Sequence, residues 1–327
     1  MSAIITRNRI KEDVEMRDAY CNTLIELAKK DDRVVVLDAD LMKSMGMIPF
    51  KEAFPDRAFD VGIQEANMIG VAAGLSATGK VPFAHSFAPF ATRRCFDQIF
   101  LSCGYAKLNV RITGSDPGIT AAFNGGTHMP FEDMGILRNI PNITILEPVD
   151  SIMLKNLLEQ TVDPYGVFYI RLLRRNAIKI YEDGSTFEIG KAVQLRDGKD
   201  VTIFATGIMV DEALKAAECL SGEGISARVV NMFTLKPIDK EMIIKCAEET
   251  GAIVTAENHS IINGLGSAVA EVLVENVPVP MERIGVRDLF GEVGPVDYLM
   301  KRFEMTSKDI VAKVKKVINF KNQRINI

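Results

Sequence analysis

The amino-acid sequence predicts an α/β protein with two doubly wound domains on mostly parallel sheets. Helical and extended patterns alternate along the whole chain, which favours βαβ units. The chain has 327 residues, 47% of them hydrophobic and 25% charged, enough for two globular domains of about 150 residues each. We expect the first domain at 10–180 and the second at 190–327, joined by the polar stretch 181–185.

The elements of the first domain follow from periodicity and length. Residues 12–30 carry apolar side chains at helical spacing, and the apolar run 34–37 is bounded by charges, as in a buried parallel strand. The other expected elements are a helix at 64–78, a strand at 81–85, a helix at 88–101, strands at 108–113 and 143–146, and a helix at 151–160 that Asp150 caps.

The second domain repeats the alternation after about residue 190. A capping-box sequence at 306–309 predicts the start of a final helix. His259 lies beside a glycine-rich helix start, and we interpret it as structural. We assign no catalytic residue to this half. Its other expected elements are strands at 201–205, 227–231, 252–255 and 282–286, with helices between them.

Charge and cysteine content narrow the class of function. The net charge is −4 with both signs interspersed, so no basic footprint for nucleic acid is present. Five cysteines without a CxxC pair favour reduced thiols, and three histidines form no metal-ligand pattern, so we expect no metal site. The sequence has neither a signal-peptide core nor an apolar run of membrane-span length. We therefore expect a cytoplasmic protein without a membrane partner.

A glycine-rich loop at 114–129 interrupts the alternation directly after the expected strand at 108–113. Ligands of open α/β sheets bind at the carboxyl ends of strands, so this loop can bring Asn124 and His128 to a cleft. A plain surface turn is an equally good interpretation of the loop taken alone.

Two further patterns each have a structural and a functional interpretation. Glu65 opens an apolar helix, either as a first-turn acid favoured by the helix dipole or as a buried carboxylate with a raised pKa suited to proton transfer. Phe87 and Phe90 are either core side chains or a stacking platform for a flat heterocycle.

Four segments together resemble the C-terminal half of transketolases, which are thiamine-diphosphate-dependent enzymes. They are LDADL with Ser44 (37–44), GIQEANMIGVAAGL (62–75), SFAPFATRRCFDQI (86–99) and NGGTHMPFEDMGILRNIPNITILEPVD (124–150). The resemblance covers nearly the whole chain from about residue 12. It implies a pyrimidine-binding domain followed by a transketolase C-terminal domain. A chain of this length resembles the C-terminal subunit of a split transketolase.

The resemblance implies cofactor-binding and catalytic roles. Glu65 matches the glutamate that hydrogen-bonds the aminopyrimidine of thiamine diphosphate, and His128 matches the histidine that contacts substrate hydroxyls. Phe90 matches the ring that stacks on the pyrimidine, Phe87 lies beside it, and Asp40 falls in a segment that lines the cofactor. The GDG…Asn pattern that holds Mg²⁺ and the diphosphate is missing. These ligands are therefore expected on an N-terminal transketolase subunit, in an α2β2 heterotetramer with its active site between subunits.

The expected sugar-binding residues match less well. Arg17, Ser44 and Arg174 fall on positions that hold the sugar phosphate in transketolases. In contrast, Asp116 replaces a phosphate-contacting histidine and Asn124 replaces an aspartate. Because an aspartate repels a phosphate dianion, we expect a non-standard sugar. Candidates are a sulfo-sugar such as 6-deoxy-6-sulfofructose, a branched apulose phosphate, or a neutral sugar.

Arg93 is also counted among the expected substrate-binding residues, although an aromatic or small residue is usual at its position. Two alternatives to a transketolase subunit stay open. One is the beta subunit of a 2-oxoacid dehydrogenase, which shares both domains. The other is a non-catalytic half with the same fold.

Overall fold

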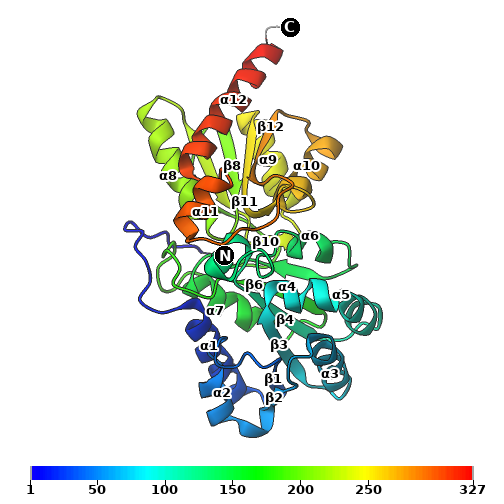
Figure 1. Cartoon of the computed structure of the whole chain (residues 1–327). Coiled ribbons are helices and arrows are strands. Elements are labelled where there is room, and N and C mark those ends of the chain that lie inside the picture. The colour runs from blue at the N-terminus through cyan, green and yellow to red at the C-terminus, as the bar shows by residue number, and fades with distance from the viewer. Residues whose placement is uncertain (1, 326–327) are drawn as a thin grey trace.

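The computed structural model describes residues 2–325. Two sheets with mostly parallel strands form two lobes, the first below the second in Figure 1. The prediction of two doubly wound α/β units is confirmed. Within 2–325, no helix has the length and apolar character that a membrane crossing needs.

The sheet of the first lobe has seven strands in the order β10-β5-β6-β4-β3-β1-β2. Neighbouring strands run parallel, except that β10 pairs antiparallel with β5. The edge strand β10 belongs in sequence to the second half of the chain, so the two lobes share a sheet. The strands are β1 (Val34–Asp38), β2 (Ala58–Asp60), β3 (Val81–Phe87), β4 (Val110–Ser115), β5 (Thr144–Leu146), β6 (Val167–Leu172) and β10 (Thr234–Lys236).

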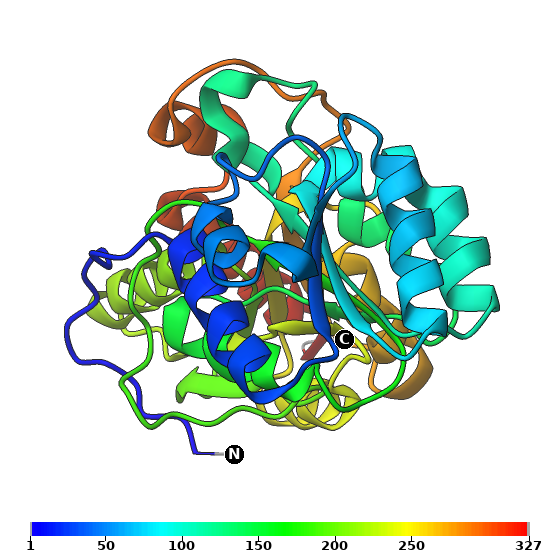
Figure 2. The same cartoon turned by 90° about the horizontal axis from the view of Figure 1, so that it is seen from below.

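Helices cover both faces of this sheet, so its central strands are buried along their whole length. Helices α1 and α7 pack together on one face, and α3 lies on the other (Figure 2). The helices of the lobe are α1 (Met16–Lys30), α2 (Ile48–Ala53), α3 (Glu65–Ala77), α4 (Ala88–Ala91), α5 (Phe96–Gln98), α6 (Asp133–Leu137) and α7 (Ser151–Gln160).

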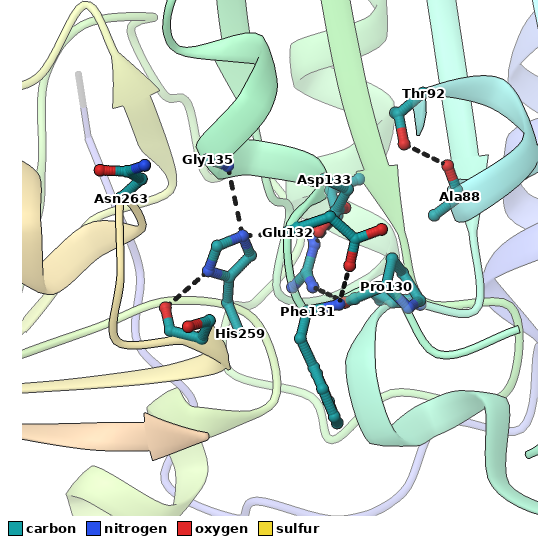
Figure 3. Close-up of polar contacts among 12 residues, drawn as sticks. Ala88, Thr92, Pro130, Phe131, Glu132, Asp133, Gly135, His259 and Asn263 are labelled. Atoms are coloured by element: carbon teal, nitrogen blue, oxygen red, sulfur yellow. Dashed lines mark hydrogen bonds and ion pairs between the residues drawn. The ribbon is translucent and has the colours of Figure 1, made fainter. Parts of the chain in front are cut away.

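The predicted continuous helix at 88–101 is wrong. The structure divides this stretch into α4, a 3₁₀ turn at Arg93–Cys95, α5 and a π-helical segment at Ile99–Tyr105. The break falls at Thr92, whose backbone leaves helical geometry while its hydroxyl donates to the carbonyl of Ala88 at 2.6 Å (Figure 3). A threonine that hydrogen-bonds the preceding turn in this way competes with the helix.

The second lobe holds a five-stranded sheet in the order β12-β11-β8-β9-β7. Only β7 runs antiparallel to its neighbour among the described strands of this sheet. The strands are β7 (Val193–Arg196), β8 (Val201–Ala205), β9 (Ala227–Asn231), β11 (Ile253–Ser260) and β12 (Met281–Val286). The helices are α8 (Met209–Gly222), α9 (Lys240–Thr250), α10 (Leu265–Asn276), α11 (Val296–Arg302) and α12 (Ser307–Ile325).

Both predicted helix starts have side-chain caps. Asp150 accepts the backbone N–H of Met153 at 2.9 Å, which satisfies a free donor of α7. At the start of α12, the carboxylate of Asp309 accepts the backbone N–H of Thr306 at 2.9 Å. The Thr306 hydroxyl donates to this same carboxylate at 2.5 Å, so only half of a capping box forms.

A buried ion network on β6 joins the two lobes. The Arg171 guanidinium contacts Asp133 at 2.7 Å and Glu147 at 2.5 Å, and it donates to the carbonyl of Asn258 on β11 at 2.8 Å. Arg171 and Asp133 are fully buried. Although burial favours the protonated acid, the guanidinium holds the pKa of Asp133 below its ordinary value. From the second lobe, the Thr206 hydroxyl donates to Glu147 at 2.8 Å.

His259 belongs to the same interface, as a structural histidine. It is fully buried at the end of β11, and burial lowers its pKa to about 4. Its Nε2 lies 3.2 Å from the backbone N–H of Gly135 on α6, and its Nδ1 lies 2.7 Å from the carbonyl of Ser260 (Figure 3). A neutral ring with its proton on Nδ1 satisfies both contacts.

The buried network leads to a prediction for stability. Arg171→Met leaves Asp133 and Glu147 buried without their cation, so we expect the free energy of unfolding to fall by about 3–5 kcal/mol. Urea titration followed by circular dichroism measures the change. Lys29→Ala is the matched control, because Lys29 forms an exposed ion pair with Glu26 and its loss should leave stability nearly unchanged. A loss below about 1 kcal/mol for Arg171→Met would contradict the role given to the network.

Candidate active site

Glu65 is a buried carboxylate at the carboxyl edge of the first sheet. It begins α3, where the helix dipole favours a negative charge, and it is 2% exposed. The terminal nitrogen of Arg94 donates to it at 2.7 Å. Sequence reasoning did not single out Arg94. The signal available was the Arg-Arg pair within the segment 86–99.

Three rings stand next to this ion pair. Phe87 directly precedes α4 and Phe90 lies within it. The His128 ring packs edge-on against both, at centroid distances of 5.7 and 5.0 Å. The Arg94 guanidinium lies 4.1 Å from the centre of the Phe90 ring, a cation–π contact. Both phenylalanines are only partly buried, so they are not ordinary core residues.

A second ion pair with a buried carboxylate lies at the Phe87 end of the rings. Asp116 follows β4 and Arg174 follows β6, so neighbouring parallel strands bring them together. The Nε of Arg174 contacts the Asp116 carboxylate at 2.8 Å, and its guanidinium lies 5.4 Å from the centre of the Phe87 ring. Burial raises the pKa of Asp116, and Arg174 opposes this shift.

Arg17 and Ser44 also meet, because Arg17 donates to the backbone carbonyl of Ser44 at 2.9 Å. The Nε of Arg17 contacts Glu15 at 2.6 Å, and the other oxygen of Glu15 contacts Arg175 at 2.8 Å. Sequence reasoning missed Glu15 and Arg175. Their proximity to Arg17 and Arg174 in the chain was the only signal for them.

Three expected site residues do not touch the rings or the ion pairs described above. Asp40 is exposed in a left-handed turn after β1, with its backbone N–H on the Asp60 carboxylate at 3.0 Å. Asn124 is exposed at the end of a 3₁₀ segment. Arg93 is exposed and pairs with Glu132 at 2.6 Å.

The second lobe contributes to the surroundings of Arg93. A pocket of about 350 Å³ has walls from the loop 126–132 and from residues 288–291. A side chain at position 126 is excluded sterically, because a Cβ there would lie 2.5 Å from the carbonyl oxygen of Gly291. The loop and the second lobe are therefore in backbone contact at this pocket.

Taken along the chain of contacts, the site is continuous from Glu65 through Arg94, the three rings and Arg174 to Asp116. It combines a buried carboxylate with half-buried aromatic faces, which suits a flat heterocycle. At its far end are guanidinium groups, which suit an anion. Within 2–325, no group of three or more His, Cys, Asp or Glu side chains is arranged to hold a metal ion.

Comparisons with known proteins agree with this architecture. Residues 12–179 match the transketolase pyrimidine-binding domain, and residues 190–310 match the transketolase C-terminal domain. A solved split-gene transketolase, an inactive beta4 tetramer, superposes with a TM-score of 0.87 at 44% identity, over 95% of this chain and 100% of that one.

Two curated relatives cover nearly the same length. The 6-deoxy-6-sulfo-D-fructose transketolase subunit SqwH of Clostridium sp. (strain MSTE9) is 56% identical over 96% of this chain and 97% of its own. An apulose-4-phosphate transketolase subunit of Phocaeicola vulgatus is 37% identical over 84% of this chain and 88% of its own. With both domains matched in order, the chain belongs to the transketolase family.

Proposed function

We propose that the chain is the C-terminal subunit of a split transketolase that transfers a two-carbon ketol unit from a ketose to an aldose. We further propose a sulfo-sugar, 6-deoxy-6-sulfofructose, as the donor. The observation that carries the proposal is the continuous site in which buried Glu65 and the Phe90 ring lead to the Arg174–Asp116 pair. The family of the chain and its similarity to a sulfofructose transketolase subunit support the same function.

The residues fit one end of thiamine diphosphate. Glu65 offers a buried carboxylate to the aminopyrimidine, and Phe90, with Phe87 beside it, offers a partly exposed ring for stacking. Asp40 lines the same edge of the sheet. When bound, thiamine diphosphate supplies the electron sink that carries the cleaved two-carbon unit. Mg²⁺ and the diphosphate are assigned to the N-terminal subunit.

This chain's own side chains bind substrate and move protons. With the cofactor bound, Glu65 would exchange a proton with a nitrogen of the pyrimidine, and His128 would hydrogen-bond the substrate hydroxyls. Arg17, Ser44 and Arg174 hold the anionic end of the sugar. The other proposed substrate contacts are Arg93, Asp116 and Asn124. Because Arg94 now occupies Glu65 and the Phe90 face, its half-exposed side chain has to move when a pyrimidine binds there.

A phosphorylated branched sugar is the second candidate donor. The similarity to an apulose-4-phosphate transketolase favours it. The higher identity to the sulfofructose relative and the carboxylate of Asp116 against Arg174 favour the sulfonate. A 2-oxoacid dehydrogenase subunit has no such support, since both domains match transketolases.

The proposed assembly is an α2β2 heterotetramer with an N-terminal transketolase subunit, located in the cytoplasm. The similar beta4 tetramer of a split-gene transketolase is inactive, which supports a catalytic need for the other subunit. It also makes a homotetramer of this chain the expected state when the partner is missing.

Substitution of Glu65 tests the proton-transfer role. In the complex with the N-terminal subunit, Glu65→Gln keeps the shape but loses the titratable group, so we expect the ketol-transfer rate to fall by about 100-fold or more. A coupled steady-state assay measures the rate, and circular dichroism checks the fold. The exposed variant Glu26→Gln should behave like wild type. Full activity of a folded Glu65→Gln complex would refute the assignment.

The donor and the partner requirement are tested together. With both subunits, thiamine diphosphate and Mg²⁺ present, we expect turnover of 6-deoxy-6-sulfofructose with a higher kcat/KM than xylulose 5-phosphate. The isolated chain should turn over neither sugar. A clear preference for xylulose 5-phosphate rules out the proposed donor, and turnover by the isolated chain rules out the shared active site.

A further inference from the structure

Three guanidinium groups converge at the carboxyl edge of the first sheet. The backbone N–H groups of Met16 and Arg17 donate to the carbonyls of Arg175 and Arg174, each at 3.2 Å. These bonds hold the start of α1 beside the end of β6. Arg17, Arg174 and Arg175 are therefore neighbours, and we call them the arginine cluster.

Two carboxylates contact the arginine cluster directly. Asp116 contacts Arg174 at 2.8 Å, and Glu15 contacts Arg17 at 2.6 Å and Arg175 at 2.8 Å. These two carboxylates offset two of the three positive charges. Asp18, 3.7 Å from Arg17 and half exposed, lowers the local potential further. The remaining positive potential attracts a singly charged anion weakly and is too small to compensate a dianion.

The remaining donors of Arg174 are close to this countercharge. Its two terminal nitrogens make no hydrogen bond with other residues in the described part of the chain, while its Nε is occupied by Asp116. Asp116 is only 3% exposed in its side chain. An anion on the terminal nitrogens of Arg174 thus lies near the Asp116 carboxylate, on the same guanidinium. Because this carboxylate is buried, solvent screens its repulsion of the anion poorly.

We propose that Asp116 and Glu15 set the charge of the anion that the arginine cluster accepts, so that a singly charged sulfonate is taken in preference to a phosphate dianion. This inference rests on the proposed transketolase function and names the side chains that choose the donor. A sulfonate keeps one charge across the working pH range, whereas a phosphate monoester carries about −1.5 to −2 at pH 7. The repulsion from Asp116 and Glu15 is therefore larger for the phosphate.

The backbone allows a clean charge deletion at position 116. Asp116 has a φ of 56°, in the left-handed region that asparagine also tolerates. An asparagine side chain at this position has the same size as the aspartate and can still accept from the Arg174 Nε. Asp116→Asn thus removes the charge with little change in shape.

The experiment compares matched six-carbon donors in the complete two-subunit enzyme. We would measure kcat/KM for fructose 6-phosphate and for 6-deoxy-6-sulfofructose at pH 8, in wild type and in Asp116→Asn. We expect the ratio of phosphate to sulfonate donor to rise on the order of tenfold in the variant, mainly through KM, since one unit of countercharge acts more strongly on the dianion. Glu15→Gln should shift the ratio in the same direction.

Asp211→Asn is the matched control, since Asp211 on α8 is also a buried carboxylate and forms an ion pair at 2.9 Å with Arg9 of the N-terminal segment. It should leave the donor ratio unchanged. An unchanged ratio in a folded, active Asp116→Asn or Glu15→Gln enzyme overturns the inference and leaves the proposed function standing. If Asp116→Asn fails to fold, Glu15→Gln alone decides. A wild-type complex that turns over neither donor refutes the proposed function itself.

Discussion

The buried contact between Arg171 and its two carboxylates is the constraint on which the rest of the site depends. Asp133 begins α6 directly after the loop that carries His128, and Glu147 follows β5. Because the same guanidinium also binds the Asn258 carbonyl, the loop, the first sheet and the second lobe are fixed to one another. Three charges removed from water are costly unless they stay paired. Keeping them paired fixes the position of the two lobes relative to each other.

The same pairing of arginine with carboxylate recurs at four places in and around the site. Glu65 has Arg94, Asp116 has Arg174, Glu15 has Arg17 and Arg175, and Glu132 has Arg93. Most charged side chains at this edge of the sheet are therefore already in ion pairs before a ligand binds. The ligand must exchange one partner for another, which makes binding sensitive to geometry and to the exact charge that the ligand brings.

The sequence predicted the main elements because their signals are local. The apolar run 34–37 and the cap at Asp150 each act within a few residues. Strand β6 was not predicted, although residues 167–170 form an apolar run as long as 34–37. Its Arg171 is fully buried, and only partners from distant segments make a buried arginine tolerable there. The break at Thr92 and the Arg94–Glu65 pair likewise depend on tertiary packing. Periodicity carries no information about such contacts.

Strand β10 gives the two lobes a topological dependence on each other. Although it belongs in sequence to the second half of the chain, β10 pairs with β5 and forms the edge of the first sheet. Next to it, the Glu147 N–H donates to the Phe233 carbonyl. A chimera that exchanged lobes between relatives at the predicted boundary, 181–185, would carry a foreign edge strand into the first sheet. To keep the first sheet intact, an exchange of the pyrimidine-binding lobe must therefore include β10, which lies some fifty residues after that boundary in the sequence.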